Sequence, residues 1–149
     1  CLLGRFLPKS PLVSELGAAR QAVARGRAPI LLPAALLAQA DPLPNSWAVT
    51  SDALAAWIAG LIEGAALVLL KDVDGLYAHW PQEQGGDSLI RRMTAAQLAE
   101  HRGGVDESLA SVLAKSQQEA WVINGRVPER LAELLQGGET LGTRIVPAP

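Results

Sequence analysis

The sequence has 149 residues, a formal net charge of −2, 49% hydrophobic residues and 19% charged residues, which suits one domain with a substantial core. It offers no basic block to neutralise nucleic-acid phosphates, and 4% aromatic residues are too few for a base-stacking surface. The single cysteine, Cys1, excludes an internal disulfide framework, and no apolar run approaches the roughly 20 residues of a membrane span. We therefore expect a cytoplasmic protein with no nucleic-acid partner and no membrane contact.

The chain opens with a predicted helix and a predicted strand. Ser10 and Pro11 resemble an N-cap followed by proline at the first helical position, and apolar residues then recur at helical spacing. Residues 11–25 are therefore predicted to form a helix. A short buried strand is expected over residues 29–32, and the prolines and asparagine of residues 41–47 indicate a loop.

A second helix and a strongly apolar strand follow. Residues 50–52 (Thr-Ser-Asp) are typical of a helix cap, and the alanine-rich residues 53–63 predict a helix that is buried against a sheet. The continuous apolar run of residues 65–70 suits a strand covered on both faces, as in parallel sheets. Asp74 and Gly75 form a turn directly after it.

The remaining residues continue the alternation of helices and strands. A polar, glycine-rich surface loop is expected over residues 79–87. The other predicted elements are short strands at 88–93, 120–123 and 143–146, and helices at 94–101, 106–117 and 128–136. Helices and buried strands in turn indicate a single α/β domain with a mostly parallel sheet.

Three segments lie where a strand ends and a helix begins, which is where open α/β sheets bind ligands. Residues 45–52 offer backbone N–H groups to an anion, or only an ordinary helix cap. Residues 70–77 offer a lysine and two aspartates to a phosphate and its Mg²⁺, or only a polar turn. Residues 124–126 end in Arg126, which binds a phosphate or is simply solvated.

Other chemistries find little support in the sequence. His79 and His101 have no partners at ligand spacing, so no metal site is expected. There is no Gly-x-Ser-x-Gly elbow, no Walker A sequence and no Gly-x-Gly-x-x-Gly.

Three motifs, in the order in which they occur along the chain, resemble the amino-acid kinase superfamily, which includes aspartate, glutamate and uridylate kinases. Residues 50–56 (Thr-Ser-Asp-Ala-Leu-Ala-Ala) are similar to the helix-opening motif of that family, with its buried aspartate. Residues 69–77 (Leu-Leu-Lys-Asp-Val-Asp-Gly-Leu-Tyr) resemble its strand-and-turn motif, which meets the nucleotide. Residues 142–145 (Gly-Thr-Arg-Ile) resemble its closing Gly-Thr-x-Ile. Residues 25–33, 43–47 and 124–131 are most similar to a branch that contains the kinase of aminomethylfuran methyl phosphate.

The resemblance implies a three-layer α/β/α fold that transfers the γ-phosphoryl group of Mg·ATP to a small acidic or phosphorylated acceptor. In that family pattern Asp52 matches the catalytic aspartate that orients phosphate-binding lysines, while Thr50 and Ser51 face the acceptor. The implied cofactors are ATP and Mg²⁺, and homo-oligomers are expected because family members commonly associate. The positions implied to bind nucleotide are Lys71, Asp72, Asp74, Gly75 and Tyr77.

Two features of the family pattern are missing from these 149 residues. One is the first strand, which ends in Lys-x-Gly-Gly-Ser, together with a second glycine cluster. The other is a second catalytic lysine, whose place is taken by carboxylates and a serine at residues 106–108. We therefore expect residues 1–149 to be the carboxyl-terminal, nucleotide-side portion of a kinase. A non-catalytic ligand- or oxoanion-binding member of the fold, and an interaction module, stay open as alternatives.

Overall fold

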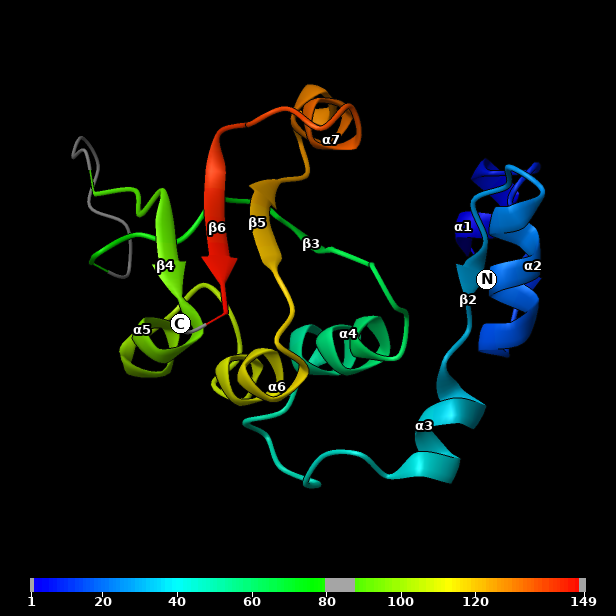
Figure 1. The fold of residues 1–149 in the computed structure, drawn as a ribbon, viewed down its shortest axis with the longest axis horizontal. Helices are drawn as coiled ribbons and strands as arrows, with labels where there is room; N and C mark the ends of the chain where they lie inside the picture. Colours follow the sequence, from blue (N-terminus) through cyan, green and yellow to red (C-terminus); the bar gives the residue numbers. More distant parts are fainter. Residues whose placement is uncertain (1, 80–87, 148–149) are drawn as a thin grey trace. The chain divides into compact units, whose positions relative to one another are not determined.

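The protein is described by a computed structural model, which covers residues 2–79 and 88–147 (Figure 1). The chain divides into two compact units, residues 1–44 and residues 45–149. The single domain predicted from the length stays a prediction. Most of the predicted loop at 79–87 lies outside the described residues. Within the described ranges, no helix is long and apolar enough to cross a membrane.

The first unit contains two short parallel strands and three helices. Strand β1 (Leu12–Val13) pairs with β2 (Ile30–Leu31), so that Leu12 lies opposite Ile30. The helix predicted over residues 11–25 is therefore wrong at its start, because strand pairing with β2 overrides the local capping pattern. The helices of this unit are α1 (Leu2–Phe6), α2 (Leu16–Ala24) and the unpredicted α3 (Ala34–Ala40).

The second unit is built on a four-stranded sheet in the order β3-β5-β6-β4 (Figure 1). The β3–β5 and β4–β6 pairs are parallel, and β5 and β6 are antiparallel. The α/β class with a mostly parallel sheet is thus confirmed. The strands are β3 (Leu67–Lys71), β4 (Arg92–Thr94), β5 (Ala120–Asn124) and β6 (Gly142–Val146).

Four helices in the described part of this unit accompany the sheet, and α6 lies between α4 and α5 (Figure 1). The helices are α4 (Ser51–Gly60), α5 (Ala95–Glu100), α6 (Leu109–Ser116) and α7 (Pro128–Leu135). The helix predicted at 94–101 forms as α5, and Thr94 caps it in a full capping box with Gln97. The largest fully buried side chains of the core are Leu76, Leu109, Leu113, Val122, Ile123, Thr143 and Ile145.

The apolar run of residues 65–70 predicts a strand covered on both faces, but the structure buries only one face of β3. Leu67 and Leu69 are buried, whereas Leu70 is 54% exposed. Because successive side chains of a strand point to opposite faces, Lys71 shares the face of Leu67 and Leu69. The alternation therefore directs the last side chain of β3 to the buried side of the sheet.

The turn after β3 packs closely against the start of β6. A Cβ atom at Gly75 would lie 2.6 Å from Thr143 Oγ1 and 2.9 Å from Leu89 Cδ1. The backbone N–H of Leu76 donates to Thr143 Oγ1 at 2.8 Å, and this hydroxyl donates to the carbonyl of Ile90 at 2.6 Å. Only glycine fits this turn, so residue 75 fixes the exit of β3.

Candidate functional site

Asp52 and Lys71 form an ion pair between helix α4 and strand β3. Lys71 Nζ donates to Asp52 Oδ1 at 2.8 Å and to Asp52 Oδ2 at 2.6 Å. The Asp52 side chain is only 7% exposed, and that of Lys71 is 25% exposed. Asp52 also stands in the first turn of α4, where the helix dipole favours a carboxylate. The aspartate thus holds the ammonium group in place while part of it stays open to solvent.

The ion pair lies at a cavity of about 390 Å³, here called the Lys71 pocket. Lys71 is the one cationic side chain among the described residues that line it. An anionic ligand entering this pocket would therefore meet a fixed positive charge at its wall. The lining residues are Thr50, Asp52, Lys71, Asp72, Val73, Gly104, Val105 and Asp106.

Three carboxylates line the Lys71 pocket, but two of them are already engaged. Asp52 accepts from Lys71, and Asp106 accepts from backbone N–H groups of two helices. Asp72 has a side chain that is 75% exposed, and its contact to Arg126 Nη2 is long, at 4.0 Å. No described group of three His, Cys, Asp or Glu residues can hold a metal by itself. Since Mg²⁺ prefers one or two carboxylates plus phosphate oxygens, Asp72 fits a Mg²⁺ that arrives with a nucleotide.

Asp106 joins the starts of helices α4 and α6. Its Oδ2 accepts from Thr50 N at 3.2 Å, Thr50 Oγ1 at 3.0 Å and Ala53 N at 2.8 Å, and its Oδ1 accepts from Leu109 N at 2.8 Å. The predicted helix at 106–117 therefore begins later, at Leu109, because Asp106 caps it from outside. Sequence reasoning missed this role, although a carboxylate after two glycines is a sequence signal for such a cap.

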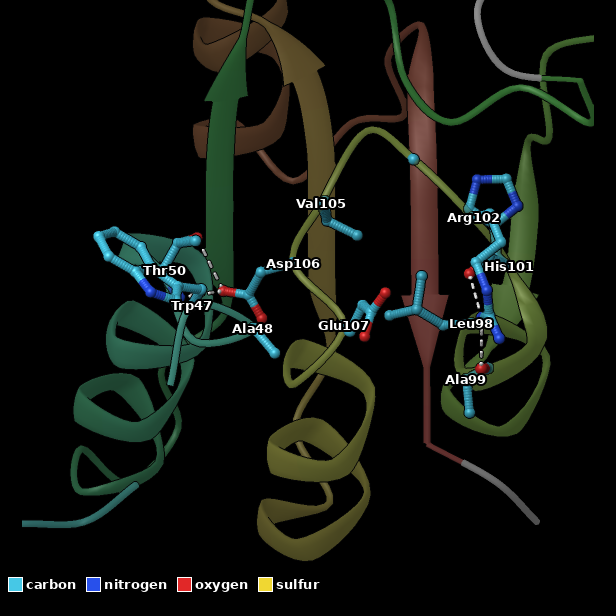
Figure 2. Close-up of a pocket in the computed structure, with 11 residues that line it drawn as sticks. Trp47, Ala48, Thr50, Leu98, Ala99, His101, Arg102, Val105, Asp106 and Glu107 are labelled. Atoms are coloured by element: carbon cyan, nitrogen blue, oxygen red, sulfur yellow. Dashed lines mark hydrogen bonds between the residues drawn. The ribbon is translucent and has the colours of Figure 1, made fainter. Parts of the chain in front are cut away.

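A second cavity, of about 530 Å³, lies on the other side of Asp106 and is here called the Trp47 pocket. In Figure 2, Trp47 and Thr50 stand on one side, Leu98 on the other, and Asp106 lies between them. The Trp47 side chain is fully exposed. Thr50, Val105 and Asp106 line both pockets, so they separate the Trp47 pocket from the Lys71 pocket.

His101 lines the Trp47 pocket with a buried Nε2 atom that has no hydrogen-bond partner in the described chain. Burial lowers the pKa of His101 below 6.5, and the charge of Arg102 adds to this, while a hydrogen bond with the backbone of Gly103 opposes it. The imidazole is therefore held in its neutral form at neutral pH.

Asp74 ties the turn after β3 to the end of β5 and to α7. Its Oδ1 accepts from Asn124 Nδ2 at 2.9 Å and from Arg130 Nη1 at 2.7 Å. These two hydrogen bonds, that of Asn124 first, hold the pKa of Asp74 below its ordinary value. Asn124 belongs to the third predicted site, and its neighbour Arg126 has a side chain that is 77% exposed. The second and third predicted segments thus meet at Asp74.

The structure gathers some of the predicted site residues in the Lys71 pocket and leaves others outside. Thr50, Asp52, Lys71 and Asp72 line it. Gly75 and Tyr77 are buried in the core, and Ser51 is exposed on the first turn of α4. Neither these three residues nor Asp74 is among its described lining residues. Their roles toward nucleotide and acceptor stay predictions.

Comparison with known proteins finds relatives that are named as kinases of small molecules. A sequence model described as "Amino acid kinase family" matches residues 7–124. The 5-(aminomethyl)furan-3-yl-methyl phosphate kinase of Methanocaldococcus jannaschii is 35% identical over 117 residues, which are 78% of this chain and 52% of that protein. The acetylglutamate kinase of Leifsonia xyli is 30% identical over 129 residues, covering 82% of this chain and 41% of that protein.

Solved structures agree with the sequence comparison. The uridylate kinase of Archaeoglobus fulgidus has a TM-score of 0.57 and 28% identity, covering 66% of this chain and 47% of that one. The UMP kinase of Ureaplasma parvum has a TM-score of 0.65 at 16% identity, over 93% of this chain and 60% of that one, and supports the fold alone. The chain spans about half the length of the relatives it matches.

Proposed function

This chain belongs to the amino acid kinase family, and we propose that it forms the nucleotide-side part of a kinase that phosphorylates a small acidic or phosphorylated metabolite with Mg·ATP. The observation that carries the proposal is the Lys71 ammonium, which Asp52 holds with both carboxylate oxygens at the wall of the Lys71 pocket. The acceptor class follows the names of the relatives, which are kinases of an aminomethylfuran phosphate and of acetylglutamate.

The fixed ammonium group suits the electrostatic needs of phosphoryl transfer. As the bond from the acceptor oxygen to the γ-phosphorus forms and the bond to the β-phosphate oxygen breaks, negative charge spreads over the phosphate oxygens. Lys71 would neutralise part of that charge from a preorganised position, because Asp52 already sets its direction. Mg²⁺, when bound with the nucleotide, would supply further charge neutralisation, and Asp72 is the residue that would hold it.

The remaining predicted residues take the supporting roles in this proposal. Thr50 and Ser51, with the loop before them, face the acceptor, and Thr50 lies between the two pockets. Asp74, Gly75 and Tyr77 shape the turn that meets the nucleotide, since Asp74 anchors it, Gly75 fits its close contact with Thr143, and Tyr77 is buried next to it. A cytoplasmic location and association of the chain with itself belong to the proposal as well.

Calorimetric titration of the chain with Mg·ATP tests nucleotide binding, once circular dichroism has shown that the chain is folded. We expect saturable binding that Lys71→Met weakens about tenfold or more, since a charge-assisted hydrogen bond to phosphate is lost. Lys115→Met is the matched control, because Lys115 is an exposed lysine near the end of α6 and does not line the pocket. A folded wild-type chain that gives no heat would favour the non-catalytic binder instead.

Phosphoryl transfer itself is tested in the complete protein. Asp52→Ala and Lys71→Ala are each expected to reduce transfer by about a hundredfold or more, because each removes one half of the charge pair. Unchanged turnover in either folded variant would contradict the site.

A further inference from the structure

We propose that Asp106 is a positioning residue whose carboxylate acts as a built-in anion for the α4 N-terminus and so keeps Asp52 in register with Lys71. The hydrogen bonds of Asp106 do not depend on any assigned function, whereas its effect on turnover rests on the proposed kinase function. No group of the ligand is needed for this arrangement, because all of its atoms belong to the chain.

Helix α4 is capped by a residue far away in the sequence. Thr50 occupies its N-cap position, yet the Thr50 side chain makes no cap hydrogen bond to the helix. Its hydroxyl donates instead to Asp106 Oδ2, which also accepts from the N–H of Ala53, 53 residues earlier in the chain. The N-terminus of a helix attracts anions through its free N–H groups and its dipole. Asp106 supplies that anion internally.

The same carboxylate also fixes the start of α6. Asp106 Oδ1 accepts from Leu109 N, so each oxygen serves one helix. A second hydrogen bond joins the start of α6 to the segment before α4, since Ser108 Oγ donates to the carbonyl of Ala48 at 3.1 Å. The start of α6 is therefore held by residue 106 to the first turn of α4, and by residue 108 to the segment just before α4.

The segment that carries Asp106 is itself tightly fitted against the turn after β3. Gly104 has a φ of 84°, and a Cβ atom there would lie 2.7 Å from Leu76 Cδ2. Leu76 in turn is anchored through its N–H to Thr143. Gly104 thus packs against the turn after β3, two residues before Asp106 contacts the first turn of α4.

Two consequences follow for the ion pair and for substrate phosphates. Asp52 directly precedes Ala53, so a shift of the first turn of α4 moves Asp52 away from Lys71. Asp106 already occupies the N-terminus of α4, where an anion would otherwise bind. A phosphate group of the substrate is therefore directed to the Lys71 pocket.

Competitive acetylation of lysines, read by peptide mass spectrometry on the folded chain without nucleotide, tests the positioning role. Acylation needs the reagent to reach the nitrogen atom, and the hydrogen bonds of Lys71 Nζ to two carboxylate oxygens restrict that approach, so the held side chain reacts slowly. In Asp106→Ala we expect Lys71 to react about fivefold faster or more, and in Asp106→Asn by a smaller factor, because one amide oxygen can still accept. Lys9 and Lys115, both exposed, are the internal references.

Glu107→Ala is the matched control variant. Glu107 is the next residue, carries the same charge, is exposed and accepts no hydrogen bond within the described chain, so its removal should leave Lys71 labelling unchanged. Unchanged labelling in a folded Asp106→Ala variant would overturn the positioning role. If Asp106→Ala does not fold, Asp106→Asn decides by the same measurement.

Inorganic phosphate tests the built-in anion directly. At about 10 mM phosphate we expect the melting temperature of Asp106→Ala to rise by more than that of the wild type, because the vacated helix N-terminus can take an anion. An equal rise in both proteins would overturn this part of the inference.

The kinetic consequence is read in the complete protein. We expect kcat of Asp106→Asn to fall at least about tenfold while the Kd for Mg·ATP changes less than about threefold, since the Lys71 ammonium group stays in the pocket and only the direction that Asp52 gives it is loosened. If kcat and the apparent affinity for Mg·ATP fell together, in proportion to a smaller folded fraction, the role of Asp106 would be purely structural and the inference would be overturned. Because labelling is measured without ligand, a wild-type chain that fails to bind Mg·ATP would refute the proposed function alone.

Discussion

Asp52 and Lys71 form an ion pair whose two ends are unequally buried. The carboxylate side chain is 7% exposed and accepts with both oxygens, whereas the lysine side chain is 25% exposed. Removing the lysine leaves a buried charge without a partner, while removing the aspartate leaves an ammonium group that can reach water. The pair therefore predicts an asymmetric mutational response.

Lys71→Met is expected to lower the free energy of unfolding by about 2–3 kcal/mol, and Asp52→Asn by about 1 kcal/mol. In the double variant the losses should not add, with a coupling energy of about 1–2 kcal/mol. Urea unfolding followed by circular dichroism measures all three.

Arg126→Met serves as the control for the ion pair. Its partner Asp72 is 4.0 Å away and both side chains are at least 75% exposed, so a loss below about 0.5 kcal/mol is expected. Equal losses for Lys71→Met and Arg126→Met would contradict the buried character of the pair.

Gly75→Ala is expected to destabilise the protein by about 1–3 kcal/mol, because the new methyl group would overlap Thr143 and Leu89. Gly17→Ala, in helix α2, is the matched substitution: no atom lies within 4 Å of the added Cβ, and about 0.5–1 kcal/mol of stabilisation is expected. Denaturant midpoints of both variants check the contrast. A Gly75→Ala variant as stable as the wild type would show that the turn can shift at little cost.

The sequence predicted the elements that carry strong periodic or apolar signals. Strands β3 and β5 follow from continuous apolar runs, and α7 begins at the predicted Pro128. The predicted helix at residue 11 is wrong because its cap pattern is local, whereas the pairing of Leu12 with Ile30 is made across the fold. Helix α3 went unpredicted because its short alanine- and leucine-rich segment carries no cap.

The candidate site was predictable in its residue types and less so in its geometry. Asp52 and Lys71, 19 residues apart, were placed at the same site through family resemblance, and the structure joins them directly. The local sequence can signal that Asp106 caps α6, but no local pattern reveals its contact with Ala53, 53 residues away. Asp74 was expected at the nucleotide, and its bonds to Asn124 and Arg130 became visible only in the folded chain.

His101 gives the protein a predicted pH dependence near neutrality. Its folded pKa lies below 6.5, so below that pH the unfolded chain takes up a proton that the folded chain refuses. The contribution of His101 to stability is then fully present above about pH 6.5 and is lost as the pH drops toward the folded pKa. Unfolding free energies at about pH 7.5 and 5.5 test this. His101→Gln should remove that part of the slope, and an unaltered slope would contradict it.

Asp72 predicts a metal-dependent effect on nucleotide binding. Asp52 and Asp106 already accept hydrogen bonds, so Asp72 is the carboxylate of the Lys71 pocket whose oxygens can take a metal. A Mg²⁺ on the phosphates would therefore reach Asp72 first. Asp72→Asn is expected to weaken binding of Mg·ATP about three- to tenfold, because a carboxylate ligand is replaced by a weaker amide oxygen.

The reference measurement for Asp72 is the same titration with ATP and a chelator. Without Mg²⁺ the Asp72 carboxylate only repels the phosphates, so Asp72→Asn should bind metal-free ATP as well as the wild type does, or better. Lys71→Met should weaken both forms, because the ammonium contacts phosphate whether or not a metal is present. If Asp72→Asn weakened metal-free ATP as much as Mg·ATP, Asp72 would be acting on the fold of the turn and not on the metal.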